Sequence, residues 1–245
     1  MSIKIGNQKI SAVAFSAGGN VFDSKSTRNP NKTELLIKFF EKTKGKDMSS
    51  EHVAKVTQFV ATNKALPFEI FINNFLREFK IDMSVTDFMM RHASDHYERL
   101  SKIAYQPGAD GVLKFLKDAK VPTALVSNFG GREVRAINSN PEIQESIGLQ
   151  DAFDVIVTRE DVSKGKPDGE SYEKAMSRLG VIPSETFCVE GSISGVLSAR
   201  NAGIKKSNTS VVLNPWNEKE KNAMRRKAMR MLGGHEDLLE LLERS

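Results

Sequence analysis

The first residues that could do chemistry directly follow an apolar run near the start of the chain. Residues 12–15 read Ala-Val-Ala-Phe, and Ser16-Ala-Gly18-Gly comes next, before Val21-Phe-Asp-Ser. Ser16 therefore stands at the end of a predicted strand, where its hydroxyl is a candidate nucleophile. A serine hydroxyl attacks only when a neighbouring base takes its proton, and Gly18 supplies no base. The residue types at this point do not make a working nucleophile.

Three later segments carry polar side chains that suit the binding of an anion or a metal. Ser127-Asn128 ends a β-rich run that begins at Val121, and Lys166 lies in the sequence Gly-Lys-Pro-Asp. A lysine ammonium group is a compact donor that neutralises phosphate charge. Glu190-Gly191-Ser follows the apolar run Phe-Cys-Val. Together with Ser16, these segments are the ones on which a function can be argued.

In order and spacing, the four segments resemble the motifs of the haloacid dehalogenase-like (HAD) phosphohydrolases. The first motif of that family is a hydrophobic strand followed by D-x-D-G-V-L-x-D-S, and its frame is matched by Phe15, Gly19, Val21, Phe22, Asp23 and Ser24. The other motifs are a P-G…S-N segment, G-K-P-x-P and V-x-V-E-D-S. The resemblance implies that Ser127, Asn128 and Lys166 stand where the family binds the transferred phosphoryl group.

The positions that carry catalysis in the family differ in this chain. Ser16 replaces the nucleophilic aspartate, Gly18 the acid/base aspartate and Gly191 a metal-binding aspartate, while Glu190 matches the adjacent acid. Gly169 also replaces the second proline of the third motif. In the family an aspartate attacks phosphorus, and Mg²⁺ shields the phosphate charge. With Glu190 as its only acid, a Mg²⁺ site would be very weak. The resemblance therefore implies a pseudoenzyme, and we expect no cofactor and a loss of Mg²⁺ binding.

Two other patterns point to different chemistry. Residues 14–18 partly match the G-x-S-x-G elbow of serine hydrolases, but the first glycine is absent. His92 and His96 are four residues apart, as in the zinc motif H-E-x-x-H, but Ala93 replaces the glutamate. We expect the two histidines to lie on a polar helix face rather than to bind zinc.

Strand-like and helix-like segments alternate from Pro107 onward. Short apolar runs predict strands, and apolar residues at helical spacing predict helices. The predicted strands are 12–15, 121–126, 153–157, 186–190 and 210–213, and the predicted helices among them are 108–120, 131–147, 170–179 and 194–202. This alternation predicts an α/β fold with a parallel sheet and helices on both faces, similar to the Rossmannoid core of the HAD family.

A block of helices without a convincing strand separates the first segment from the second. Apolar residues recur at helical spacing in four stretches between residues 33 and 103. The block resembles the helical cap of the β-phosphoglucomutase and phosphoglycolate phosphatase-like branch. We expect residues 1–27 and 104–245 to form the core and residues 28–103 to form an inserted cap. We further expect residues 218–245 to form a basic and then an acidic helix appended to the core.

Composition is that of an ordinary globular protein. The chain has 245 residues, a formal charge of +5 and 39% hydrophobic residues. No apolar run approaches the roughly 18 residues of a membrane span. The single cysteine, Cys188, rules out an internal disulfide, and its apolar neighbours predict a buried thiol. Without a recognisable leader segment, we expect an intracellular protein, with the cytoplasm and the mitochondrial matrix both open.

The basic stretch from Glu218 to Arg230 is the candidate contact surface. Its basic residues are Lys219, Lys221, Arg225, Arg226, Lys227 and Arg230. We interpret them as a contact with other protein subunits, with RNA or anionic lipid as alternatives.

The sequence thus predicts a catalytically inactive HAD-fold protein that serves as a structural or interaction subunit of a larger assembly. Organellar complexes such as a mitochondrial ribosome, a respiratory complex or an ATP synthase are candidate hosts. A pseudoenzyme that senses phosphate or a phosphosugar is one alternative, and a residual phosphatase is another. The identity of the partner and the oligomeric state stay open.

Overall fold

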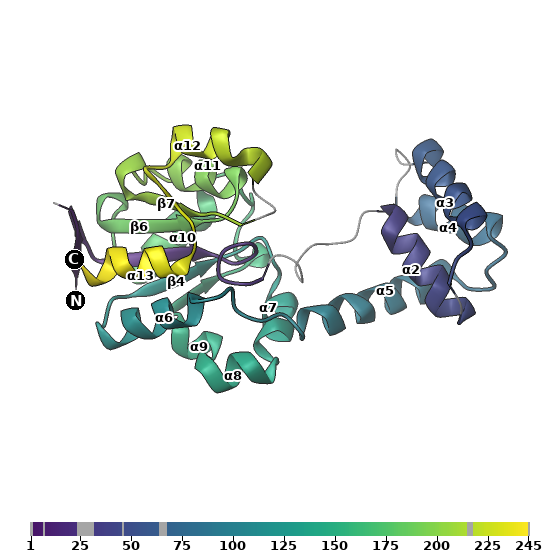
Figure 1. Cartoon of the computed structure of the whole chain (residues 1–245), viewed down its shortest axis with the longest axis horizontal. Helices are drawn as coiled ribbons and strands as arrows, with labels where there is room; N and C mark the ends of the chain where they lie inside the picture. The colour runs from purple at the N-terminus through teal and green to yellow at the C-terminus, as the bar shows by residue number, and fades with distance from the viewer. Residues whose placement is uncertain are drawn as a thin grey trace. The chain divides into compact units, whose positions relative to one another are not determined.

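The chain divides into two compact units, which are described separately. The structure is a computed structural model that describes residues 2–6, 8–23, 32–45, 47–63, 68–214 and 218–244. One unit comprises residues 1–27 with 99–245, and the other comprises residues 28–98. The first is an α/β core and the second is a group of helices (Figure 1).

A six-stranded parallel sheet forms the centre of the α/β core. Its order is β5-β4-β3-β6-β7-β8, and every neighbouring pair is parallel. The strands are β3 (Ala12–Ser16), β4 (Thr123–Val126), β5 (Val155–Val157), β6 (Thr186–Glu190), β7 (Thr209–Val212) and β8 (Arg230–Leu232). The chain runs outward from β3 to β5 and then returns to β6 on the other side of β3. Loops after β3, β4 and β6 therefore diverge at the carboxyl end of the sheet, where α/β folds place their ligands.

The central strands are apolar because helices cover them. Every residue of β3, β4, β6 and β7 is buried. On one face, α10 (Glu170–Leu179) and α11 (Ile193–Asn201) pack their apolar sides on strand residues such as Ala14 and Val126. Elsewhere α6 (Ala109–Asp118) packs against α13 (His235–Glu243), which also contacts β8. The predicted α/β fold with a parallel sheet is confirmed.

The core differs from the sequence prediction in two places, one before β3 and one between β4 and β5. A two-stranded antiparallel hairpin, β1 (Ile3–Ile5) and β2 (Gln8–Ile10), precedes the main sheet. The helix predicted over 131–147 is divided into α7 (Gly131–Asn138) and α8 (Pro141–Ile147), followed by α9 (Leu149–Ala152). Proline disfavours helical geometry in the residue before it, so Asn140 becomes the N-cap of α8, where its side chain accepts from the Glu142 amide at 3.0 Å.

The C-terminal segment also differs from the two appended helices that the sequence predicts. After a short turn of 3-10 helix, α12 (Lys221–Lys227) is only seven residues long, and the chain then enters β8. Because β8 pairs with β7, this segment completes the sheet rather than adding to its outside. A strand of three residues is too short to show an alternating pattern, so its pairing partner, remote in sequence, decides its structure.

The second unit is built from helices around an aromatic core. Its helices are α2 (Lys32–Lys44), α3 (Ser50–Asn63), α4 (Phe68–Glu78) and α5 (Val85–Leu100). Phe39 and Phe88 pack with ring centroids 4.3 Å apart, and Phe59 contacts both Phe71 and Phe75. This is the helical cap that the resemblance implies. Among the helices of the described residues, none is long and apolar enough to cross a membrane.

A buried polar chain ties the C-terminal helix to the loop after β3. His235, the first residue of α13, is 2% exposed, and its Nε2 lies 3.2 Å from Oδ1 of Asn20. The Asn20 amide in turn donates to the Val189 carbonyl of β6 at 2.6 Å. Burial lowers the pKa of His235 to about 4, against an opposing effect of Asp110. At neutral pH the imidazole is therefore uncharged.

We expect His235 to contribute to the acid sensitivity of the fold. An exposed histidine has a pKa near 6.5, so between pH 6.5 and about 4 the unfolded chain binds a proton that the folded chain does not. The free energy of unfolding should therefore fall by about 3 kcal/mol as the pH drops through this range. Denaturant titrations at several pH values measure the fall. His235→Gln keeps an N–H donor for Asn20 and should lose this part of the pH dependence; a variant with the wild-type pH dependence would contradict the assignment.

Candidate functional site

The loop after β3 lines a cavity of about 210 Å³ at the carboxyl end of the sheet. The lining residues come from the segments that the sequence singles out: Ser16, Ala17, Gly18, Val126, Ser127, Asn128, Phe129, Lys166, Ser192 and Ser194. The side chain of Ser16 is buried, and none of the described residues forms a hydrogen bond with its Oγ. The parallel sheet therefore brings Ser16, Ser127, Asn128 and Lys166 to one cavity, as the resemblance implies.

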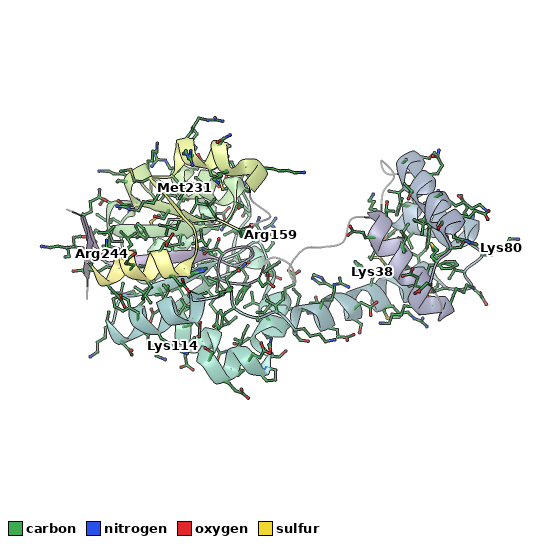
Figure 2. All side chains as sticks on the ribbon, in the orientation of Figure 1. Lys38, Lys80, Lys114, Arg159, Met231 and Arg244 are labelled. Atoms are coloured by element: carbon green, nitrogen blue, oxygen red, sulfur yellow. The ribbon has the colours of Figure 1, made fainter. Side chains whose placement is uncertain are left out.

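Ser127 and Asn128, which follow β4, form hydrogen bonds with the backbone of the loops beside the cavity. The Ser127 hydroxyl accepts from the Phe129 amide at 2.8 Å, and Oδ1 of Asn128 accepts from the Lys166 amide at 3.1 Å. These bonds fix the loop after β4 and the Lys166 backbone to each other. The outer surface of the core is different in character, with long charged side chains such as Lys114 and Arg244 projecting from it (Figure 2).

Lys166 and Glu190 form a buried ion pair beside the cavity. Lys166 Nζ lies 2.6 Å from Glu190 Oε1, and the two side chains are 7% and 0% exposed. The Tyr172 hydroxyl, from α10, donates to the same Oε1 at 2.5 Å and accepts from the Cys188 thiol at 3.2 Å. Burial raises the pKa of Tyr172 and that of Cys188, so both stay protonated and act as donors. The thiol is buried, as the sequence predicts.

Gly195 makes room for the Glu190 carboxylate. A Cβ at Gly195 would stand only 1.9 Å from Glu190 Oε2, so any side chain there would displace the carboxylate. Gly195 lies in the first turn of α11, where its amide donates to the N-cap residue Ser192 at 3.1 Å. The glycine therefore allows Glu190 to point against the helix while its Oε1 faces Lys166 and Tyr172.

Position 191 is closed by the backbone of the loop after β3. A Cβ at Gly191 would lie 2.5 Å from the Gly19 carbonyl oxygen and 2.8 Å from the Gly19 carbonyl carbon. The loop is held in this place because Asn214 donates to the Gly19 carbonyl at 2.6 Å and Asn20 donates to Val189. Real Cβ atoms do not approach other atoms so closely, so an aspartate at this position requires the loop to move.

A similar contact explains the departure at Gly169 from the family's third motif. Its Cβ would lie 2.8 Å from the Ala202 nitrogen and 2.9 Å from the Asn201 carbonyl carbon. Gly169 is the N-cap of α10 and meets the end of α11 backbone to backbone. A proline ring at this position would require the two helices to separate.

The residues around the cavity do not fit Mg²⁺. The ion prefers oxygen ligands, with carboxylates supplying negative charge. Among the described residues, no three His, Cys, Asp or Glu side chains lie close enough together to bind a metal ion. Glu190 already faces an ammonium group and a phenol, Ser16 and Gly18 carry no carboxylate, and position 191 has no room for one. No step of a reaction can be derived through a metal at this site.

The other residues that the sequence singles out lie elsewhere. His92 and His96 lie on α5, outside any cluster of potential metal ligands within the described part of the chain. Lys219, Arg225, Arg226 and Lys227 are exposed, and Lys221 is half-buried. Arg230 lies on β8 rather than on a helix, donates to the Ser207 carbonyl at 2.9 Å and stacks over Phe187. The guanidinium of Arg230 thus contacts residues of its own α/β core.

Sequence reasoning missed several residues that shape the site. Tyr172 and Gly195 control the Glu190 carboxylate, while Asn20, Asn214 and His235 hold the loop after β3. Asn20 is the residue with the clearest available signal, because an amide inside an otherwise apolar and glycine-rich stretch needs buried partners. Gly195 matches the glycine that follows V-x-V-E-D-S in the family's fourth motif, although the sequence does not show that it makes room for Glu190.

Comparison with known proteins identifies the family. The sequence model of the haloacid dehalogenase-like hydrolases matches residues 29–208, well over half of the chain. The chain belongs to this family. The matched range contains Ser127, Lys166 and Glu190 but begins after Ser16 and Gly18, the positions at which the first motif departs from the family.

Curated relatives of the chain are phosphatases by name. A bifunctional riboflavin kinase/FMN phosphatase of Arabidopsis thaliana is 30% identical over 130 residues, which are 53% of this chain and 33% of that protein. A phosphorylated carbohydrates phosphatase of Thermotoga maritima is 35% identical over 100 residues, 41% of this chain and 44% of that protein. The chain thus spans less than half the length of these relatives.

Solved structures match nearly the whole fold. A Thermotoga maritima protein described as a candidate β-phosphoglucomutase has a TM-score of 0.71 at 23% identity, covering 96% of this chain and 99% of that one. CbbY from Rhodobacter sphaeroides in complex with phosphate has a TM-score of 0.63 at 20% identity, with the same coverage. At this level of identity the likeness shows the fold alone.

We expect Gly191→Ala to destabilise the protein, because its methyl group would overlap the Gly19 carbonyl. Overpacking of this kind costs about 1–3 kcal/mol of unfolding free energy. Gly111→Ala is the matched control, since a Cβ there, on helix α6, has no atom within 4 Å. The control should gain about 0.5–1 kcal/mol from helix propensity. Denaturant unfolding of both variants measures the difference, and equal stability of the two would show that the loop does not pack on Gly191.

Proposed function

We propose that this chain is a HAD-fold protein that does not catalyse phosphoryl transfer and that serves as an interaction subunit of a larger assembly. The observation that carries the first part is the closed position 191. Where the family places a metal-binding aspartate, the Gly19 carbonyl leaves no space for a side chain. Removal of the metal and of both catalytic carboxylates takes away the nucleophile, the proton donor and the charge compensation together.

Ser16 is a poor substitute for the missing nucleophile. Attack by a serine requires a base within hydrogen-bonding reach of its hydroxyl. No described residue contacts Ser16 Oγ in that way, and the Glu190 carboxylate beside the cavity is paired with Lys166.

Support for an interaction role comes from the surface around α12. Arg225, Arg226 and Lys227 are consecutive and exposed, and Met229, two residues later, is 60% exposed. Exposed cations beside an apolar side chain suit a protein partner with an acidic surface, since arginine and methionine are both enriched at protein interfaces. β8 follows directly and anchors this segment in the sheet, so the surface is presented by a fixed element.

The proposal predicts no turnover of phosphate esters. Purified protein should not release phosphate from a panel of phosphosugars and phosphoglycolate above the rate of a heat-treated sample, with or without added Mg²⁺. A related active HAD phosphatase assayed in parallel serves as the positive control. Mg²⁺-dependent turnover that Ser16→Ala abolishes would overturn the proposal.

We also expect the α12 surface to determine association in the native host. The triple variant Arg225→Glu, Arg226→Glu and Lys227→Glu should shift the protein from a large complex to a smaller species in sedimentation or native electrophoresis of cell extracts. The control carries the same charge change at Arg132, Arg135 and Lys174, which are exposed on α7 and α10. Identical sedimentation of wild-type protein and both variants would contradict a contact through α12.

A further inference from the structure

The cavity beside Ser16 contains one cationic side chain among the residues that line it, and that cation is already neutralised. Lys166 Nζ pairs with Glu190 Oε1 at 2.6 Å, with both side chains almost fully buried. The remaining polar lining is uncharged and consists of the hydroxyls of Ser16, Ser127, Ser192 and Ser194 and the amide of Asn128. The lining as a whole therefore offers hydroxyl and amide groups without a free positive charge.

We infer that the Glu190 carboxylate, which is buried outside the lining and pairs with Lys166, serves as the resident anion for the cavity's lysine, so that the cavity takes small uncharged polyhydroxy molecules and rejects phosphate. Phosphate drawn to Lys166 would have to share that ammonium with a carboxylate of like charge, and burial screens such repulsion poorly. Among the described residues, no cluster of metal ligands is present to hold a divalent cation that would offset it. Position 191 has no room for a metal-binding side chain, and the Glu190 carboxylate neutralises Lys166; both features disfavour the binding of phosphate.

A second observation supports an uncharged ligand. Ser16 is 5% exposed, lines the cavity, and has a hydroxyl without a partner among the described residues. A buried hydroxyl left unpaired is costly, and a ligand hydroxyl can both donate to it and accept from it. The cavity volume of about 210 Å³ is roughly seven times the ~30 Å³ that one water occupies in the liquid. It therefore suits a molecule of the size of a triol such as glycerol.

The carboxylate is held in place by the fold and not by a ligand. Tyr172 donates to Glu190 Oε1, the Gly191 amide donates to Oε2 at 3.1 Å, and Gly195 leaves the space that the carboxylate fills. Glutamine at position 190 would have nearly the same shape without the negative charge. Glu190→Gln would then free the Lys166 ammonium to bind an added anion.

The first test uses wild-type protein and needs no variant. Glycerol and inorganic phosphate are added at equal concentrations while the amide resonances of Ser16, Ser127 and Phe129 are followed by NMR. Glycerol should shift these resonances more than phosphate does. An equal or larger shift with phosphate would overturn the inference.

The second test converts the cavity into a phosphate site. Isothermal titration with inorganic phosphate should show binding to Glu190→Gln at least about tenfold tighter than to wild-type protein, a difference of about 1.4 kcal/mol. The double variant Lys166→Met with Glu190→Gln lacks both charges and should lose the gain. Folded Glu190→Gln with wild-type phosphate affinity would overturn the inference. If the single variant is unfolded, recovery of its circular dichroism on addition of phosphate supports the inference, and failure to recover counts against it.

This inference rests on the proposed non-catalytic site, but the two fail in different ways. Turnover of phosphate esters would overturn the proposed function. Tight binding of phosphate to wild-type protein without turnover would leave that function standing and would overturn only the assignment of Glu190 as the resident anion.

Discussion

The close approach of the Gly19 backbone to Gly191 is the constraint on which the rest of the site depends. It places the loop after β3 against the end of β6, where a side chain at position 191 would otherwise stand. Asn20 and Asn214 hold the loop there through hydrogen bonds to Val189 and Gly19, and His235 supports Asn20 from the C-terminal helix. Because these partners come from three different parts of the chain, the loop cannot relax without disturbing β6, β7 and α13. The loop in which the chain departs from the family's first motif is therefore built into the packing of the core.

The Lys166–Glu190 pair shows how such a fold can keep residues of its family while their partners change. A buried ion pair is not in itself strong evidence for stability, since desolvation offsets much of the attraction. Removing one member is nevertheless costly, because the other is left as an uncompensated buried charge. Tyr172 and Gly195 add a hydrogen bond and the necessary space. Lys166 and Glu190 thus depend on each other, since each supplies the counter-charge for the other's burial.

The C-terminal segment connects the two halves of the proposed function. Its exposed cations on α12 form the candidate contact surface, β8 completes the sheet, and α13 places His235 against Asn20. The same stretch of chain thus supports the loop that closes position 191 and presents the candidate contact surface.

The sequence by itself determined the fold class, the helical cap and the segments whose residues line the cavity. These follow from local signals: apolar runs, helical spacing, and polar residues at strand ends that a parallel sheet brings to one edge. Only the tertiary structure decided that Gly191 is closed, that Glu190 is paired with Lys166, and that β8 joins the sheet. Each of these depends on contacts between remote residues, such as Asn20 with Val189 and with His235, separated by 169 and 215 positions. Periodicity and residue type describe neighbours along the chain, whereas the space left for a side chain is set by whatever backbone folds against it.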